Sequence, residues 1–206
     1  MPPKLLKVGI TGGIGSGKTF VCKIFEVLGI DVYYADQRAK WLQQHNPHLI
    51  KQIKSAFGNA AYDQQGCLDR IFLAKEVFGN PKKLSLLNQL VHPKVAEDYT
   101  QWVKHRLQKP YTLKEAALLY ETGSYRQLDY VINVDAGRDT RLQRVLERDV
   151  HRTKRQVEAI MNKQFGDEER HQLADVTIDN SGGVLIVPQI VQIHELLLEM
   201  ATDSGK

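Results

Sequence analysis

A glycine-rich stretch near the amino end carries the clearest chemical signal of the chain. Residues 12–19 read GGIGSGKT, which matches G-x-x-x-x-G-K-[ST] in full between an apolar run and an amphipathic segment. Glycines let main-chain amides point into one hollow, and the following helix adds its positive end. Lys18 can reach the β- and γ-phosphates, and the Thr19 hydroxyl can ligate Mg²⁺. The pattern predicts a nucleoside triphosphate site, against the alternative of a tightly packed strand-to-helix turn.

The rest of the chain narrows the class of phosphate-loop protein. A guanine-nucleotide switch needs N-K-x-D and D-x-x-G, but residues 162–165 read NKQF, and the DQQG of residues 63–66 follows no buried strand. A motor or helicase would need a longer chain than 206 residues. A small-molecule kinase is therefore favoured, acting on an acceptor that these patterns leave open, and a nucleotide-binding switch is the weaker alternative.

Asp36 closes the β-branched and aromatic run IDVYYAD, which predicts a strand over residues 30–36. At that sheet edge its carboxylate could orient a substrate hydroxyl and take its proton. An equally good reading is a helix N-cap for the polar segment that follows.

Basic side chains form a second candidate group. On a helix they would fall near one face, where they could close over a triphosphate as a lid, with a hinge near His151. The alternative is a solvated face paired with Glu147 and Asp149. The arginines lie at positions 138, 141, 144, 148, 152 and 155.

Two further residues lie in the long helical stretch that follows Asp36. Arg70 could bind an acceptor phosphate, although a purely structural role is the simpler reading. His92 precedes Pro93, which predicts a helix start and a capping role.

The periodicity of the chain predicts a parallel sheet covered by helices on both sides. A helical stretch over 37–107 exceeds a simple crossover, so it is read as an insertion at the carboxyl edge of the sheet. A capping box at Thr153 and Gln156 starts a helix, and Ile190, Ile193, Leu197 and Met200 mark the buried face of the last one. Strands are expected over 5–10, 30–36, 115–121, 129–136 and 175–183, and helices over 18–28, 138–149 and after Pro188.

Composition indicates which ligands and which cellular compartment suit the protein. Hydrophobic residues make up 42% of the chain, and the formal net charge is +4, which suits anionic ligands but is too small to indicate nucleic acid. No apolar run is long enough for a membrane span. Two cysteines, Cys22 and Cys67, form no disulfide framework, which indicates a reducing compartment, and we expect a cytoplasmic protein.

Several separated motifs together match the pattern of one protein family. They run from residue 8 to residue 183 in the family's order, and the opening loop and the final stretch are the most specific. The chain departs from the family's pattern at Tyr34, Ala117 and Val150, where an acid, a proline and a glycine are common. The matching stretches are GITGGIGSGKT, YAD with QRAK, FG, GCLDR, VFGNP, HP, ALLYETG, LQRVLERD and LADVTIDNSGG. With these stretches the chain resembles the dephospho-coenzyme A kinase family.

This resemblance implies a P-loop, nucleoside-monophosphate-kinase-like α/β/α fold with a five-stranded parallel sheet. It implies a nucleotide-binding core over 1–36, 110–137 and 174–206, a helical dephospho-CoA domain over 37–109 and a lid over 138–173. It also implies transfer of the γ-phosphoryl of ATP to the 3′-hydroxyl of the ribose of dephospho-CoA, the last step of coenzyme A synthesis, in a monomer or small homo-oligomer.

The resemblance further assigns individual residues. Asp36, Lys18 and Arg144 are implied as catalytic residues, and Thr19 as the metal ligand. Asp36, Arg70, His92 and Glu121 are implied to bind dephospho-CoA. The ATP site is implied to comprise Thr11, Gly12, Gly13, Ile14, Gly15, Ser16, Gly17, Lys18, Thr19, Arg144, Arg148 and Asn180.

Overall fold

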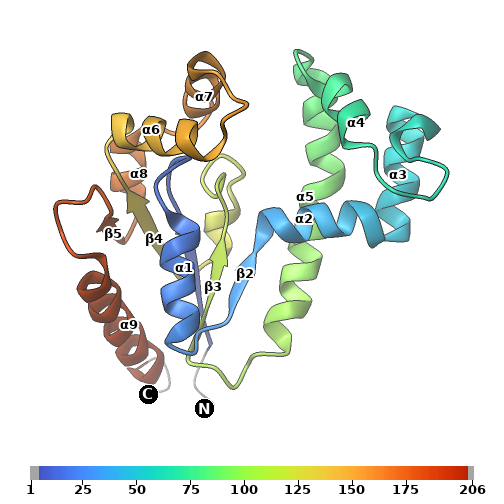
Figure 1. Ribbon diagram of the computed structural model, residues 1–206. Helices are drawn as coiled ribbons and strands as arrows, with labels where there is room; N and C mark the ends of the chain where they lie inside the picture. The colour runs from blue at the N-terminus through green and yellow to red at the C-terminus, as the bar shows by residue number, and fades with distance from the viewer. Residues whose placement is uncertain (1–4, 204–206) are drawn as a thin grey trace. The chain divides into compact units, whose positions relative to one another are not determined.

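The protein is described by a computed structural model that covers residues 5–203. Its centre is a fully parallel sheet with strand order β2-β3-β1-β4-β5 (Figure 1). The expected α/β fold with a five-stranded parallel sheet is confirmed in this part of the chain. The strands are β1 Leu6–Thr11, β2 Val32–Tyr34, β3 Tyr111–Glu115, β4 Tyr130–Asp135 and β5 Val176–Asp179.

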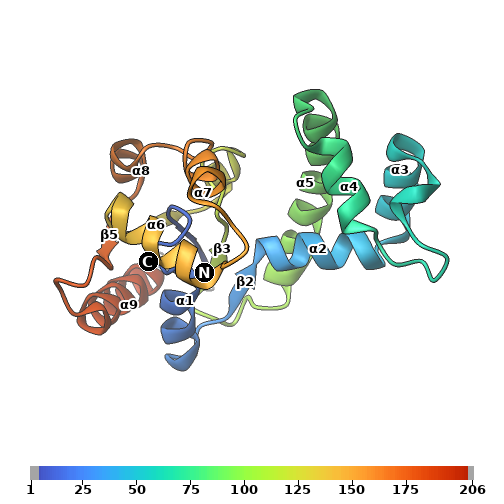
Figure 2. The same ribbon diagram turned by 45° about the horizontal axis from the view of Figure 1, so that its top comes forward.

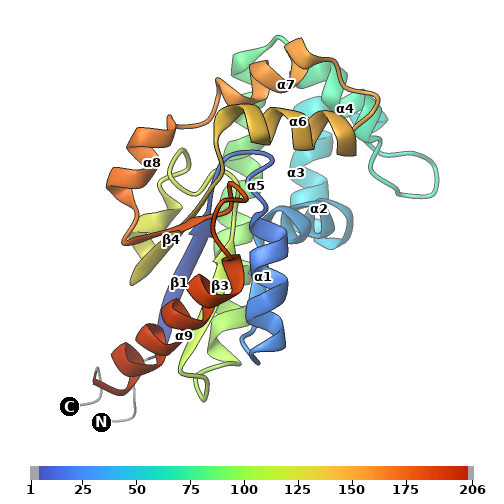
Figure 3. The ribbon, with the colours of Figure 1, turned by 60° about the vertical axis from the view of Figure 1, so that its left-hand side comes forward.

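Alternation along β1 divides the sheet into two faces. Val8 and Ile10 are fully buried with the apolar sides of α1 (Lys18–Val27) and α9 (Ile186–Asp203). Gly9 points to the opposite face, where a Cβ atom would stand 2.8 Å from Leu119 and 2.6 Å from Leu128. Figure 3 shows α1 and α9 on one side of the sheet and α8 (Asp167–Leu173) on the other. Because successive side chains of β1 point to opposite faces, both faces of the sheet are covered, which gives three layers.

Two helices lie over the end of the sheet that carries the glycine-rich loop (Figure 2). They are α6 (Arg138–Arg148) and α7 (Lys154–Met161), and the short break between them confirms the predicted helix pair. The Thr153 hydroxyl accepts from the Gln156 N–H at 3.3 Å, and the Gln156 side chain accepts from the Thr153 N–H at 2.8 Å. This reciprocal capping box is confirmed as predicted from the sequence.

A second compact unit runs from Ala35 to His105, whereas the described residues before and after it form the sheet-containing unit. Its own core buries Leu42, Leu49, Ile53 and Val91. Asn46 and Asn80 each cap a helix that begins with proline, which suits the first helical position. The helices are α2 Ala35–His45, α3 Pro47–Phe57, α4 Arg70–Val77 and α5 Pro81–Lys104; the chain also has short 3₁₀ turns η1 Asn59–Ala61 and η2 Ser124–Gln127.

Two predicted strands differ from the structure. The strand expected over 30–36 ends at Tyr34, and Asp36 lies in the first turn of α2, where an acidic side chain is favoured by the helix dipole. The strand expected over 115–121 is instead β3, which ends at Glu115. Thr112 and Lys114 are polar yet buried in this central strand, so hydrophobicity alone placed it too late in the chain.

The helix start expected at His92 is also wrong. His92 and Pro93 lie inside the 24-residue helix α5, which begins at Pro81 after its Asn80 cap. Pro93 has no N–H to donate within the helix, but the apolar contacts of α5 continue on both sides of it, through Val91 and Val95. Tertiary packing therefore outweighs the local cost of the proline.

Candidate functional site

The glycine-rich loop joins β1 to α1 and is shaped by close contacts that exclude side chains. Gly12 has φ +150°, and a Cβ atom there would stand 2.2 Å from the carbonyl oxygen of Val134. Gly17 has φ +93° and immediately precedes α1, with Asn180 Nδ2 2.3 Å from its would-be Cβ. The loop therefore needs glycine at these two positions for both conformation and space.

Lys18 is buried at the start of α1 and turns its charge toward the loop. Its Nζ donates to the carbonyl oxygen of Gly12 at 2.8 Å and to that of Gly13 at 3.3 Å. Thr11, which ends β1 directly before the loop, is buried as well. The ammonium thus stands at the loop itself, where it can meet an anion.

Some main-chain N–H groups of the loop donate to protein acceptors and others do not. The Ile14 N–H donates to Gln164 Oε1 at 2.8 Å, and the Ser16 N–H donates to the Gly13 carbonyl at 3.1 Å. Within the described chain, the N–H groups of Gly15, Gly17 and Thr19 donate to no protein acceptor. Unpaired donors gathered at a helix N-terminus form a site for an anion.

An acidic residue that the sequence analysis did not single out lies at the end of β3. Glu115 is 8% exposed and pairs in register with Ile10 of β1 and Tyr34 of β2. Burial raises the pKa of the Cys22 thiol, the Glu115 carboxylate raises it further, and Lys18 opposes both. Glu115 and Lys18 therefore both lie within electrostatic reach of the same side chain on α1.

The arginines of α6 have different surroundings. Arg141 is 3% exposed, its Nε donates to the Ala136 carbonyl, and its Nη2 donates to both oxygens of Asp167 at 2.6 and 2.7 Å. Arg144 is half-buried, and within residues 5–203 its Nη1 is buried without an acceptor. Among the arginines of α6 in the described residues, Arg144 is thus the one with a buried donor left for an anion.

Arg148 is largely exposed and forms a pair with the neighbouring Asp149. Its Nε and Nη2 donate to the Asp149 carboxylate at 2.9 and 3.1 Å, and Arg152 contacts the same carboxylate. The hydrogen bond to Arg148 lowers the pKa of Asp149 and raises that of Arg148. This pairing matches the solvated-face alternative, and Arg148 must leave Asp149 to reach a phosphate.

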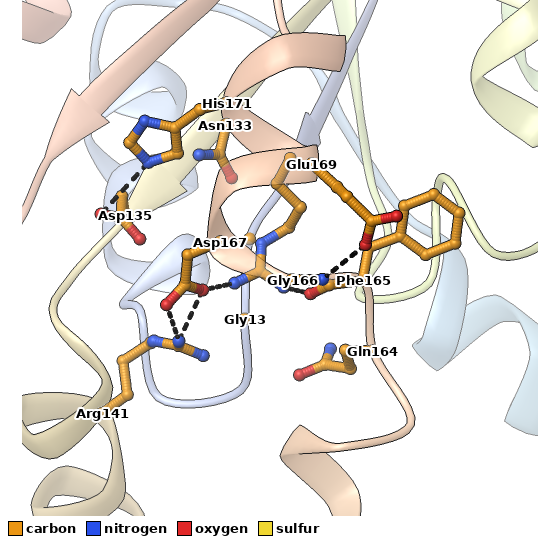
Figure 4. Close-up of polar contacts among 12 residues, drawn as sticks. Gly13, Asn133, Asp135, Arg141, Gln164, Phe165, Gly166, Asp167, Glu169 and His171 are labelled. Atoms are coloured by element: carbon orange, nitrogen blue, oxygen red, sulfur yellow. Dashed lines mark hydrogen bonds and ion pairs between the residues drawn. The ribbon is translucent and has the colours of Figure 1, made fainter.

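Figure 4 shows further residues around the loop that no sequence motif marks, among them Gln164 and Asp167. Arg170 of α8 is 4% exposed and donates to Asp167 and to the Phe165 carbonyl. Burial lowers the pKa of Arg170, although a guanidinium stays charged. No sequence pattern marks Asp167 and Arg170, because the stretch 162–173 is short and polar, which is typical of a solvent-facing connection.

Two predicted site residues of this unit have structural partners. The Asn180 Nδ2 donates to the Ser16 carbonyl at 2.7 Å, and the Asn180 N–H donates to the Asp135 carbonyl at 2.7 Å. Glu121 lies in the turn region after β3, where its Oε1 accepts from the Phe165 N–H at 2.8 Å. Both residues therefore belong to the framework around the loop.

The remaining predicted residues lie on the helices of the second unit. Asp36 is exposed in the first turn of α2, and Arg70 is exposed at the first residue of α4, next to its Asp69 cap. His92 is exposed on α5, and partial desolvation lowers its pKa. It lines an open hollow along that helix with Leu84 and other α5 side chains.

Comparisons with known proteins place the chain in one family. A profile of the family described as dephospho-CoA kinase matches residues 6–185. The dephospho-CoA kinase of Chlorobaculum tepidum is 37% identical over 200 residues, covering 94% of this chain and 95% of the relative, and that of Porphyromonas gingivalis is 35% identical over 195 residues, covering 93% and 94%. The crystal structure of TT1252 from Thermus thermophilus superposes with a TM-score of 0.82 at 28% identity, covering 94% and 97%. Across the described helices, none has the length and apolar character of a membrane span.

Proposed function

The chain belongs to the dephospho-CoA kinase family, and from this premise we propose how its own residues transfer a phosphoryl group from ATP to dephospho-CoA. The family's reaction is ATP-dependent and makes coenzyme A and ADP, with the 3′-hydroxyl of the acceptor ribose as the nucleophile. The site assignment rests on the amides of Gly15, Gly17 and Thr19, which find no acceptor among residues 5–203 and lie beside the Lys18 ammonium.

ATP would bind with its phosphates in the loop over residues 12–19. The amides that lack acceptors and the N-terminal end of α1 supply partial positive charge there, and Lys18 supplies a full one. Asn180 would stay at the nucleotide end, because its side chain already holds the Ser16 carbonyl. The loop would position the phosphates, because phosphoryl transfer requires little covalent chemistry from the protein.

A magnesium ion fits the oxygen donors near the loop. Mg²⁺ usually takes one or two protein oxygens and fills its remaining positions with substrate phosphates and water. The Thr19 hydroxyl at the first turn of α1 is the proposed direct ligand, and the Glu115 carboxylate at the end of β3 would hold its water. When bound, the ion would neutralise developing charge on the phosphate oxygens.

Asp36 is the proposed base for the acceptor hydroxyl, a role that its exposed carboxylate can fill. Arg70, His92 and Glu121 are proposed to bind dephospho-CoA. Arg144, whose Nη1 has no acceptor in residues 5–203, is proposed to donate to the transferring phosphoryl group, with Arg148 beside it. Helices α6 and α7 would then work as the lid.

We also propose a cytoplasmic protein that acts as a monomer or small homo-oligomer, with magnesium-ATP and dephospho-CoA as its ligands and no part for nucleic acid or membrane. The two thiols, one buried at Cys22 and one exposed at Cys67, are free, which suits a reducing compartment.

An acceptor panel tests the reaction. The protein is incubated with Mg-ATP and dephospho-CoA, nucleosides or nucleoside monophosphates in turn, and ADP release is followed. Rapid release that requires dephospho-CoA supports the proposal. Faster release with a nucleoside would point to another small-molecule kinase, and slow release that ignores the acceptor would point to a switch.

A further inference from the structure

Gln164 connects two loops that lie far apart in the sequence. It lies between α7 and α8, where its Oε1 accepts from the Ile14 N–H at 2.8 Å and its Nε2 donates to the Ala117 carbonyl at 3.2 Å. One partly buried amide thus uses both ends at once, on the phosphate loop and on the turn after β3. Figure 4 shows this side chain beside the loop at Gly13.

The backbone next to Gln164 is itself held in place. The Phe165 N–H donates to Glu121 Oε1 at 2.8 Å, and the Phe165 carbonyl accepts from Arg170 Nη1. The Phe165 ring stacks on that of Tyr120 with centroids 6.2 Å apart. Gln164 therefore presents its amide from a fixed backbone, as a positioning group must.

The neighbouring residue of the loop is confined from the same side. A Cβ atom at Gly13 would stand 2.0 Å from Arg141 Nη1 and 3.1 Å from Arg170 Nη2. The Asp167 carboxylate, which accepts from both guanidiniums, holds them there. The Gly13–Ile14 peptide is thus limited by guanidinium packing at one residue and by a hydrogen bond at the next.

We propose that Gln164 is a positioning residue for ATP. It takes up the Ile14 N–H and fixes the outer turn of the loop, so that the amides of Gly15, Gly17 and Thr19 face the phosphates without further ordering. This inference rests on the proposed assignment of the loop to the ATP phosphates. Without Gln164 the loop loses its anchor, whereas Lys18 and the start of α1 remain.

Gln164→Ala removes both hydrogen bonds, and Gln164→Glu keeps only the acceptor toward Ile14. For Gln164→Ala we expect KM for ATP to rise about tenfold, the scale of one well-placed hydrogen bond, with kcat within about threefold and KM for dephospho-CoA unchanged. Gln164→Glu should fall between that variant and the wild type. A normal KM for ATP in Gln164→Ala would overturn the proposal.

Gln44 offers a matched control in the second unit. Its amide also accepts from a main-chain N–H, that of Leu68 at 2.8 Å, and donates to a carbonyl, that of Gly66 at 3.0 Å. Gln44→Ala loses the same kinds of bond and should leave KM for ATP unchanged. An equal rise in both variants would mean that general loosening, and not positioning, explains the effect.

Amide hydrogen exchange tests the anchor without any nucleotide. In Gln164→Ala the Ile14 amide should exchange at least about tenfold faster, while amides of β1 such as Val8 keep their rates. Unchanged Ile14 exchange would refute the anchor itself. Lys18→Ala distinguishes the assignment of the loop to ATP from the anchoring of the loop by Gln164. Unchanged ATP binding in that variant would show that the loop is not the ATP site, whereas the exchange result for Ile14 would still report on the anchor.

Discussion

The side chain of Asn180 donates to the main-chain oxygen of Ser16 at 2.7 Å, and the same Nδ2 atom occupies the space where a Cβ atom of Gly17 would stand. The turn after β5 and the start of α1 are thereby fitted to each other. A substitution at Gly17 must displace this contact as well as strain the backbone.

Gly17→Ala and Gly29→Ala together distinguish the effect of a steric clash at the new Cβ atom from the effect of backbone strain. Both glycines have positive φ, +93° and +84°, but Gly29 has nothing within 4 Å of its would-be Cβ. We expect each variant to lose about 1 kcal/mol of unfolding free energy, measured with urea, from the left-handed conformation. Only Gly17→Ala should also raise KM for ATP, by about tenfold or more. A similar KM in both variants would show that the Asn180 contact is unimportant for ATP.

Asp36→Asn should lower kcat by about 10²-fold, the scale of a lost base, with KM for ATP within about twofold. The change also removes a first-turn acid from α2, which should cost about 0.3 to 1 kcal/mol of stability. Asp139→Asn is the control, because Asp139 occupies the first turn of α6. Steady-state kinetics on both variants decide the matter: near wild-type turnover in Asp36→Asn would remove Asp36 from the mechanism.

Arg144→Ala should reduce kcat/KM for ATP by about 10² to 10³-fold, because it removes the charged donor that we propose for the transferring phosphoryl group. Arg155→Ala is the matched control, since Arg155 belongs to the same arginine row but is exposed on α7. It should change kcat/KM less than about twofold. Equal effects in the two variants would favour a general electrostatic field over a specific contact.

Acid should weaken the turn after β5 through Asp179. Hydrogen bonds from the Ser181 hydroxyl and N–H hold the pKa of Asp179 below its usual range. Because the unfolded chain then binds the proton more readily, stability falls as pH drops from about 5 through about 3.9. Asp179 is only partly buried, so solvent screens its interactions and the effect is small. Urea midpoints at pH 6 and 3.5 should differ less in Asp179→Asn than in the wild type; an identical difference would argue against this linkage.

Local sequence predicted the elements whose signals are local. The glycine loop, the Thr153 capping box and the buried face of α9 each depend on residues a few positions apart, and the structure has all three. The strand expected over 115–121 lies too late in the chain, because the buried Thr112 and Lys114 of β3 pair with strands that are distant in the sequence. The helix start expected at His92 is wrong for a similar reason, because tertiary packing keeps α5 helical on both sides of Pro93.

The framework of the site was less accessible from sequence. Gln164 meets Ile14 across 150 positions, and Arg141 meets Asp167 across 26, so no local pattern marks either contact. The strand expected over 115–121 would begin at Glu115, so the sequence does not predict that this acid lies at the carboxyl end of β3. Long-range contacts of single polar side chains are what one sequence conveys least.

Amide resonances of the loop give the most direct test of the central claim, that residues 12–19 hold the phosphates of ATP. Mg-ATP is titrated into ¹⁵N-labelled protein while amide shifts are recorded. The account predicts large shifts at Gly15, Gly17 and Thr19, whose N–H groups lack acceptors within residues 5–203, and smaller ones at Ile14 and Ser16, which already donate. Saturation by ATP with no change at the first three amides would contradict it.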